Sequence, residues 1–161
     1  MEDKLMAVRE IILDTDPQLR EKCIEVKRFN ATLHQLLDDM KETMEDANGA
    51  GLAAPQVGIN KRIFVADGGE GYVEMINPRI TKKSGEDIDM EGCLSVPGRQ
   101  GYVRRALKIT IEAQDRFGNA FVMEPEGWQA RIFQHEYDHL DGRLYTDIML
   151  KEVFLEDEEE E

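Results

Sequence analysis

The amino-acid sequence predicts an α+β domain in which two helices pack with short strands. Three observations lead to this fold class: a helical apolar stripe in the first third of the chain, short alternating segments in the middle, and a second helical segment near the end. Strands and helices do not alternate regularly, so a parallel sheet is not expected. No linker or repeat interrupts residues 1–150, so we assign them to one domain and residues 151–161 to an acidic tail.

The first helix is predicted at residues 32–47. Thr32 and Gln35 have the spacing of a capping box, in which each side chain bonds the backbone of the other residue. Asn48 and Gly49 are residue types that commonly end a helix. Apolar residues recur at helical spacing between these ends and are expected to pack in the core: Leu33, Leu36, Leu37, Met40 and Met44.

Four short strands are predicted in the middle of the chain. They lie at residues 62–66, 73–76, 108–114 and 120–123. Apolar and polar residues alternate in the third of them, which is the period of a half-buried strand. Residues 115–119 have the composition of a turn, so we expect the last two strands to be joined there.

A second helix is predicted at residues 128–140. Pro125 and Gly127 precede it, and Gly142 lies just past its end, where glycine favours helix termination. Trp128 at its start is expected to be a core residue or the wall of a pocket.

Charge limits the possible partners of the chain. The formal net charge is -14 at pH 7, and residues 156–161 are all acidic, which leaves about -8 on the remainder. Like charges in a run repel one another, so we expect the acidic run to be disordered. Nucleic-acid binding is not expected, because it depends on Lys and Arg side chains that displace counterions from phosphates.

The sequence carries no evident signal for export, organelle import or membrane insertion. Residues 1–6 are neither apolar nor Arg-rich, and no apolar run approaches the roughly 20 residues of a membrane span. We therefore expect a cytoplasmic protein. Its two cysteines, Cys23 and Cys93, suggest no disulfide framework, so each is either a buried inert thiol or a catalytic or ligand residue.

A His-Glu-x-x-His motif lies in the second predicted helix. His135 and His139 are four residues apart on one helix face, so both imidazoles can reach one metal ion. Glu136 lies beside them, where a carboxylate can exchange protons with an activated water molecule. This five-residue pattern alone also arises by chance. His34 has no such partner and is expected to be an ordinary helix residue.

The third metal ligand decides the class of enzyme, because a catalytic site normally has three protein ligands and one open position. Thermolysin-like peptidases take a Glu from a later helix, but only a short segment and the tail follow His139. Metzincins have a third His six residues on, where this chain has Tyr145. Neither protease class fits. Upstream, Cys93 offers a thiolate among small residues.

Three motifs together resemble those of the peptide deformylase family, in its order and spacing. They are GAGLAAPQ at residues 49–56, EGCLS at 91–95 and QHEYDHLDG at 134–142, about 22 residues in all. One such motif alone would be weak, whereas three in order argue against coincidence. The resemblance implies short antiparallel sheets around a central metal-binding helix, with a further N-terminal helix.

The resemblance also implies an activity, which is removal of the formyl group, as formate, from the N-terminal methionine of newly synthesised proteins. The metal ligands would be Cys93, His135 and His139. Such donors favour borderline-soft divalent ions, and the family resemblance implies iron(II), for which zinc, nickel or cobalt can substitute. Nascent formyl-methionyl peptides would be the partners, with transient proximity to the ribosome, although the acidic C-terminus puts docking through a basic extension in doubt.

Three further residues match the family's catalytic groups. Glu136 would be the general acid and base, while Gln56 and the backbone N–H of Leu94 would bind the developing oxyanion. The physical chemistry agrees, because a metal lowers the pKa of bound water toward about 7 and a neighbouring carboxylate can accept the proton and return it to the leaving amine.

Five residues are expected to contact or shape the substrate pocket. Gly49 and Gly51 are either turn glycines or, by resemblance, glycines that let an extended substrate approach. Glu91 would support the metal ligands from behind, and Ile132 shares the histidine face of the helix. Arg131 departs from an apolar pocket, and we expect its guanidinium to extend over the rim to solvent.

Two other functions stay open at this point. The chain could be another amidase or a small metallopeptidase that acts on unformylated peptides with the same ligands. It could also be a binding module with a structural metal. A structural site would need a fourth protein ligand, which the sequence does not offer beside the motifs, and Glu136 would then have no role.

Overall fold

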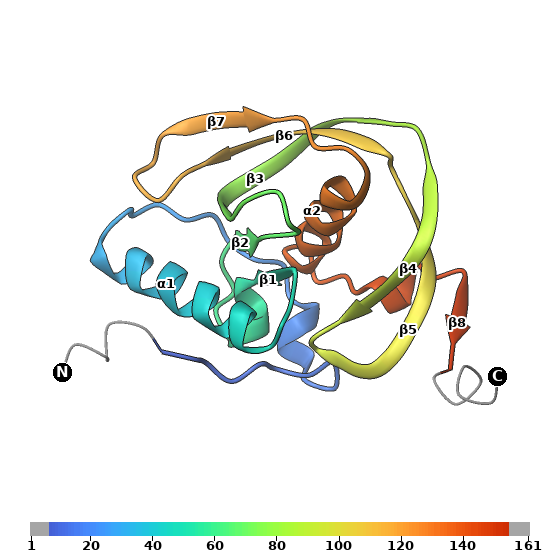
Figure 1. Ribbon diagram of the computed structural model, residues 1–161. Helices are drawn as coiled ribbons and strands as arrows, with labels where there is room; N and C mark the ends of the chain where they lie inside the picture. Colours follow the sequence, from blue (N-terminus) through green and yellow to red (C-terminus); the bar gives the residue numbers. More distant parts are fainter. Residues whose placement is uncertain (1–6, 155–161) are drawn as a thin grey trace.

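The structure is a computed structural model that describes residues 7–154. Within this range the chain forms two α-helices, α1 (Ala31–Asp46) and α2 (Gly127–His139), and eight strands in two antiparallel sheets. Figure 1 shows α2 in the interior with strands around it, and α1 at one side. The predicted α+β class and the central helix are confirmed.

The larger sheet has the strand order β1-β2-β3-β6-β7. All four residues of β2 are buried, because they serve two cores in alternation: Phe64 and Ala66 face α2, whereas Ile63 and Val65 face α1. The bounds of its strands are β1 (Gly51–Ala53), β2 (Ile63–Ala66), β3 (Val73–Ser84), β6 (Lys108–Gln114) and β7 (Ala120–Met123).

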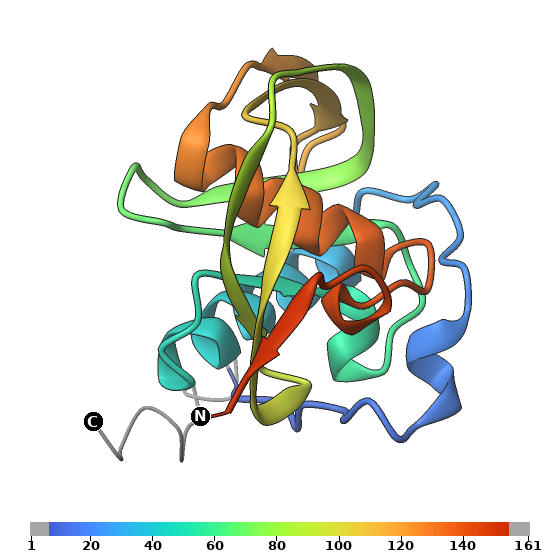
Figure 2. The same cartoon turned by 90° about the vertical axis from the view of Figure 1, so that its right-hand side faces the viewer.

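The smaller sheet has the strand order β4-β5-β8 and covers another side of α2 (Figure 2). The long strand β3 leads into it through a turn at Gly85, whose φ of 70° suits glycine. Its strands are β4 (Asp87–Cys93), β5 (Val96–Arg105) and β8 (Lys151–Val153). Because β4 ends at Cys93, this sheet delivers a thiol to the side of α2.

The sequence prediction does not include β1, β4, β5 or β8, and it ends β3 too early, at residue 76. In the structure Asn77 has a φ of 53° and the pairing with β6 shifts register there, so the strand bends and continues. The Asn77 side chain bonds both the N–H and the carbonyl of Val26. Strands β4 and β5 are rich in charged residues and glycine, which have low strand propensity.

Both helices begin and end near the predicted positions. The apolar stripe of α1 is buried as expected. Its predicted capping box was wrong, because Asn30 is the N-cap and its side chain accepts a hydrogen bond from the N–H of Leu33 at 3.1 Å. Because Asn30 is the N-cap, Thr32 lies inside the first turn of the helix and cannot occupy the N-cap position. Helix α2 begins and ends one residue earlier than the predicted range 128–140.

The C-terminal end of the described chain belongs to the small sheet. Lys151–Val153 form β8 and pair with β5 at residues 100–102, so assigning these three residues to the tail was wrong. Their pairing is secured by an Arg99 side chain that bonds both carboxylate oxygens of Glu152. Residues 156–161, for which we predicted disorder, lie outside the described residues. Neither helix within residues 7–154 has the length and apolar character needed to cross a membrane.

Candidate metal centre and active site

Three metal-ligating side chains meet where β4 ends beside α2. The ligand atoms of Cys93, His135 and His139 all lie within 4.8 Å of one another. The sulfur of Cys93 lies 3.5 Å from Nε2 of His139. A metal bound about 2.3 Å from a sulfur and about 2.0–2.1 Å from each imidazole nitrogen fits ligands at these separations. The structure thus brings together the three residues for which the sequence predicted a shared metal.

Helix α2 presents the two imidazoles on successive turns. Their ring centroids lie 5.2 Å apart, and both side chains are buried. Burial, together with the neighbouring His135, holds the pKa of His139 well below its ordinary value. A neutral imidazole is the form that binds a metal. Nδ1 of His139 is buried and has no hydrogen-bond partner among the described residues.

Glu91, in β4, orients His135. One carboxylate oxygen, Oε1, lies 2.9 Å from Nδ1 of His135, which leaves Nε2 of that ring for the metal side. Arg105 donates to both oxygens of Glu91, at 2.8 and 2.9 Å, and to Asp138 at 2.7 Å. Burial alone would raise the pKa of Glu91, but the hydrogen bonds from Arg105 and His135 outweigh it and hold the pKa below its ordinary value. The carboxylate is therefore charged at neutral pH.

The expectation for Arg131 was wrong. Its guanidinium does not extend to solvent, since the residue is only 2% exposed. It donates to Glu91 at 2.7 Å, to the carbonyl of Val103 at 2.9 Å and to the carbonyl of Asp87 at 2.8 Å. A buried carboxylate and two strand carbonyls bind the cation more completely than water at the rim would. Arg131 therefore joins α2 to β4 and β5.

Glu136 is buried at the edge of the metal-ligand cluster. Burial raises its pKa to about 7. Its Oε1 has no hydrogen-bond partner within residues 7–154. Gly51, at the start of β1, lies directly against this carboxylate. A buried carboxylate with such a pKa can both accept and donate a proton near neutral pH.

The amide of Gln56 is held in one orientation beside Cys93. It lies in the short helix η3 (Ala54–Val57), and its Oε1 accepts a hydrogen bond from the N–H of Ala53 at 2.9 Å. Its Nε2 donates to Ser95 Oγ at 3.0 Å and points toward Cys93 Sγ at 3.6 Å. Because the acceptor oxygen is fixed, the amide cannot flip without losing these bonds, and an N–H stays directed at the metal-ligand cluster.

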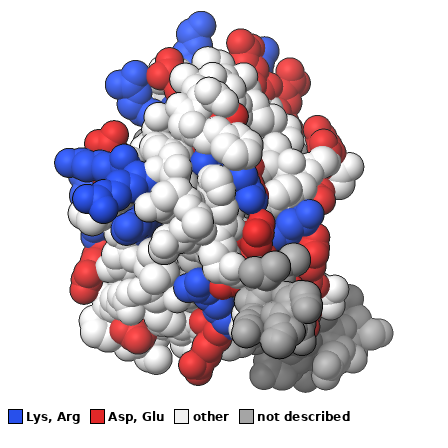
Figure 3. Space-filling model, turned by 90° about the vertical axis from the view of Figure 1, so that its left-hand side faces the viewer, with Lys and Arg blue, Asp and Glu red and all other residues white. Residues whose placement is uncertain are grey.

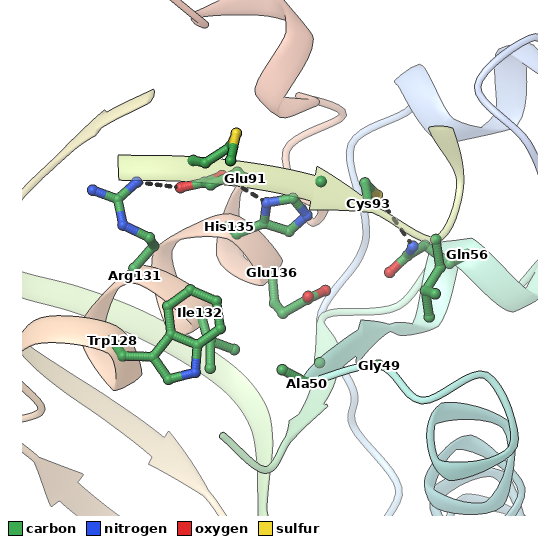
Figure 4. A pocket seen from close by; sticks show the side chains of 14 residues that line it. Gly49, Ala50, Gln56, Glu91, Cys93, Trp128, Arg131, Ile132, His135 and Glu136 are labelled. Atoms are coloured by element: carbon green, nitrogen blue, oxygen red, sulfur yellow. Dashed lines mark hydrogen bonds and ion pairs between the residues drawn. The ribbon is translucent and has the colours of Figure 1, made fainter. Parts of the chain in front are cut away.

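A pocket of about 280 Å³ opens beside these groups. Figure 4 shows Ile132 and Trp128 below Glu91 and His135. Glu136 lies between His135 and the segment that contains Gly49 and Ala50. Trp128 is 51% exposed, so it forms a wall at the pocket mouth. The five predicted substrate residues all line this pocket, which is formed by Gly49, Ala50, Gly51, Gln56, Met90, Glu91, Gly92, Cys93, Leu94, Trp128, Arg131, Ile132, His135 and Glu136.

Sequence reasoning missed one residue that supports the site, Arg105, and gave no role to another, Ser95. Arg105 holds Glu91 and Asp138, and its burial could have been found only by recognising β5, where it shares a face with the apolar Val103. Ser95 lies in the second motif, and its hydroxyl accepts a hydrogen bond from Gln56, a partnership that the motif alone does not indicate.

Two residues considered at first lie outside the site. Cys23 packs in the core with α2, and burial raises the pKa of its thiol to about 11, which makes it an inert thiol. The Nε2 atom of His34 lies 2.8 Å from the carbonyl of Arg116. Of the two alternatives for Cys23, these contacts favour the buried inert thiol, and the position of His34 agrees with the ordinary helix residue expected.

Comparison with known proteins agrees with the geometry. The family model for polypeptide deformylase matches residues 8–153. The peptide deformylase of Caldicellulosiruptor bescii is 52% identical over 154 residues, which are 96% of this chain and 92% of that protein. Peptide deformylase 1 of Clostridium perfringens is 54% identical over 144 residues, or 88% of this chain and 98% of that protein.

Solved structures also resemble the chain over most of its length. The crystal structure of peptide deformylase from Thermotoga maritima has a TM-score of 0.87 at 40% identity, and it covers 88% of this chain and 97% of its own. A peptide deformylase from Synechococcus elongatus in complex with actinonin has a TM-score of 0.85 at 37% identity, with coverage of 88% and 78%. The match over nearly the whole length, in both sequence and fold, means that this chain belongs to the polypeptide deformylase family.

Proposed function

We propose that this chain hydrolyses the formyl amide at the N-terminal methionine of newly synthesised proteins and releases formate. The observation that carries the proposal is the meeting of one thiol and two imidazoles beside a buried carboxylate, Glu136, whose pKa is about 7, at the edge of a substrate-sized pocket. The family relationship supports the same activity.

Cys93, His135 and His139 would hold the metal ion. Their sulfur and nitrogen donors suit iron(II), zinc, nickel or cobalt better than magnesium or calcium. We propose iron(II) as the physiological ion. When bound, such an ion polarises a carbonyl group and lowers the pKa of a water molecule toward about 7. The fit of the site is supported by Nε2 of His139, which lies 3.5 Å from the sulfur of Cys93, and by Glu91 behind His135, which is the usual support for a ligating imidazole.

Glu136 would carry the proton in the reaction. Its carboxylate accepts the proton of the attacking water and then returns it to the amine of the methionine as the C–N bond breaks. The unpartnered Oε1 leaves an acceptor free for this water. Burial raises the pKa of Glu136 to about 7, so both protonation states are populated at neutral pH.

Gln56 and the backbone N–H of Leu94 would stabilise the negative charge that develops on the formyl oxygen. The Nε2 of Gln56 is already directed at the side of Cys93. Leu94 follows Cys93 in the two-residue connection between β4 and β5. Donors held in place before the reaction need no reorganisation when the charge appears. Each such donor lowers the activation barrier by about 2.7–4 kcal/mol.

The pocket would receive the methionine side chain. Ile132, Trp128 and Met90 offer it apolar and polarisable surface. Gly49 and Gly51 line the side of the pocket along which an extended peptide backbone would lie. A side chain of Leu94 already fills the space above Gly49, where a Cβ would lie 2.8 Å from Leu94 Cδ1, so a larger residue at 49 would close this side.

The partners we propose are nascent formyl-methionyl peptides in the cytoplasm, met near the ribosome without stable binding to nucleic acid or to a membrane. The charge distribution supports the absence of nucleic-acid binding. On the face in Figure 3, Lys and Arg side chains are interspersed with Asp and Glu. The overall net charge of -14 also opposes contact with phosphates.

Formate release from a set of three peptides tests the proposal. The purified chain, with its metal content measured, is given formyl-Met-Ala-Ser, acetyl-Met-Ala-Ser and free Met-Ala-Ser. We expect rapid formate release from the first, and no cleavage of the other two. His135→Gln should lose metal and activity together, whereas His34→Gln, a matched change in α1, should retain both. Cleavage of the acetylated or free peptide would indicate a general amidase or a peptidase instead.

A further inference from the structure

We propose that Arg131 is a positioning residue that acts through Glu91 to orient His135. The carbon stem of Arg131 also forms part of the wall of the substrate pocket. This inference rests on the proposed function, because it names the residue that fixes one of the three metal ligands. Arg131 lies where an apolar pocket would be expected to have an aliphatic residue.

The guanidinium of Arg131 is fixed from three sides. It donates to Oε2 of Glu91 at 2.7 Å and to the strand carbonyls of Val103 and Asp87 at 2.9 and 2.8 Å. The residue is 2% exposed, so water does not compete for these donors. A planar guanidinium with several oxygen partners has one orientation, which a lysine ammonium could not reproduce.

Glu91 passes this constraint to His135. Arg131 and His135 lie one turn apart on α2, and the carboxylate bridges them, with Oε2 on Arg131 and Oε1 on His135 (Figure 4). Arg105 bonds both oxygens from β5 and also bonds Asp138 on α2, so it joins the carboxylate to the sheet and to the helix. Arg131 adds a second point of attachment to α2, one turn before His135. The carboxylate that orients His135 is therefore tied to α2 on both sides of that residue, at Arg131 and Asp138.

Charge explains why the arginine is tolerated in a buried pocket wall. Arg105 and Arg131 contribute two positive charges, and their acidic partners are Glu91, Asp138 and the partly exposed Asp87, which lies 3.5 Å from Arg131. Removing one member of such a buried group leaves a charge without a partner. Because the terminal nitrogens of Arg131 are directed at Glu91 and the sheet, its contribution to the pocket comes mainly from carbon atoms.

The test compares Arg131→Met and Arg131→Lys with Arg79→Met. Methionine keeps an apolar stem of similar length without the charge, and lysine keeps the charge with a single nitrogen. Arg79 is a matched control because it pairs with Glu112 on the exposed side of β3. For each protein, cobalt(II) affinity is measured by chelator competition on the metal-free form, together with the cobalt absorption spectrum, kcat and KM.

We expect Arg131→Met to weaken cobalt binding by about 10–100-fold, to alter the cobalt spectrum and to lower kcat. KM for a formyl-methionyl peptide should change by less than about threefold, since the stem of similar volume still lines the pocket. Arg131→Lys should lie between the wild type and Arg131→Met, and it keeps the result readable if the methionine variant does not fold. Arg79→Met should match the wild type in all four measurements.

A double variant separates action through Glu91 from a general structural effect. If Arg131 acts through Glu91, then Glu91→Gln with Arg131→Met should bind cobalt within about twofold of Glu91→Gln alone. Loss of affinity equal to the product of the two single effects would overturn the proposal. So would unchanged cobalt affinity and spectrum in both Arg131 variants, even with a lower melting temperature. Failure of the wild type to release formate would refute the proposed function, yet the cobalt measurements would still test this inference.

Discussion

Gly51 and Glu136 are in such close contact that no side chain fits between them. A Cβ atom built on Gly51 would lie 2.6 Å from Oε2 of Glu136 and 2.9 Å from its Cδ. Gly51 belongs to β1, and its requirement for glycine comes from this lack of space and not from a left-handed backbone. The first sequence motif thus fixes the position of a carboxylate in the third.

Gly51→Ala should lower turnover on the order of 10²-fold, because the methyl group forces the Glu136 carboxylate to move and small misplacements of reacting groups have costs of this size. Metal content should stay unchanged, since Gly51 does not contact the three ligands. Single-turnover formate release with metal analysis on the same sample checks this. Wild-type turnover in a metal-loaded variant would mean that the carboxylate position is not critical.

The helices and the two histidine ligands could be predicted from sequence because their signals are local. The apolar stripe of α1 and the spacing of His135 and His139 each depend only on helical periodicity. Cys93 is connected to the histidines only by the resemblance of the motif around it, since it lies 42 positions before His135 and no local rule joins them.

The support of the site could not be predicted, because it depends on pairings between distant segments. The partners of Glu91 are Arg105 on β5 and Arg131 on α2, and both look like surface residues when the strands are not recognised. The sequence rule that a lone arginine extends to solvent failed at Arg131 because the rule has no knowledge of a buried carboxylate 40 positions away. Tertiary structure decided this case.

Glu136→Gln should leave metal content intact and reduce kcat by about 10²–10⁴-fold, because glutamine keeps the size of the side chain but cannot accept a proton. Glutamine has nearly the same shape as glutamate and should keep the same contact with Gly51, so the melting temperature serves as a control. Near-normal turnover by a fully metallated variant would remove Glu136 from the mechanism.

Glu91→Gln should destabilise the metal-free protein at pH 7 by about 3–5 kcal/mol, because Arg105 and Arg131 would remain buried with too little negative charge. The difference should depend on pH. The pKa of Glu91 in the folded chain is below its ordinary value, so its carboxylate contributes stability above the unfolded-state pKa of about 4.3, and this contribution is lost as the pH falls toward the folded-state pKa.

Urea unfolding of the wild type and of Glu91→Gln at pH 7 and at about pH 3.5 tests this pH dependence. The difference between their free energies of unfolding should be smaller at the lower pH. Glu112→Gln, which removes the exposed partner of Arg79, is the control and should cost about 0–1 kcal/mol at either pH. A difference in free energy of unfolding that grows on acidification would contradict the negative charge assigned to Glu91.

Two truncations distinguish the acidic run from β8. Removing residues 156–161 should leave the melting temperature and turnover unchanged, because a run of like charges buries little apolar surface. Removing residues 151–161 also removes the pairing of β8 with β5 and the bond between Arg99 and Glu152. A loss of about 1–2 kcal/mol is expected there, and each kcal/mol lowers the melting temperature by about 2–4 °C. Equal melting temperatures for the two truncated proteins would show that β8 contributes nothing to stability.

The iron(II) form should lose activity quickly in air, whereas nickel and cobalt forms should stay active for longer. Bound iron(II) can activate oxygen, and the adjacent Cys93 thiolate is then exposed to oxidation to sulfenic and sulfinic acids. Nickel and cobalt keep a Lewis acid among the same ligands without that oxygen chemistry, and the zinc form should be clearly slower.

Metal-free protein is reconstituted with each ion under anaerobic conditions, formate release is followed with and without oxygen, and both cysteines are analysed by mass spectrometry. Cys23 is the internal control, because burial raises the pKa of its thiol to about 11 and should keep it unmodified. Iron and nickel forms of equal lifetime in air, with Cys93 intact, would overturn the oxidation account, and activity in the absence of any metal would overturn the proposed function as well.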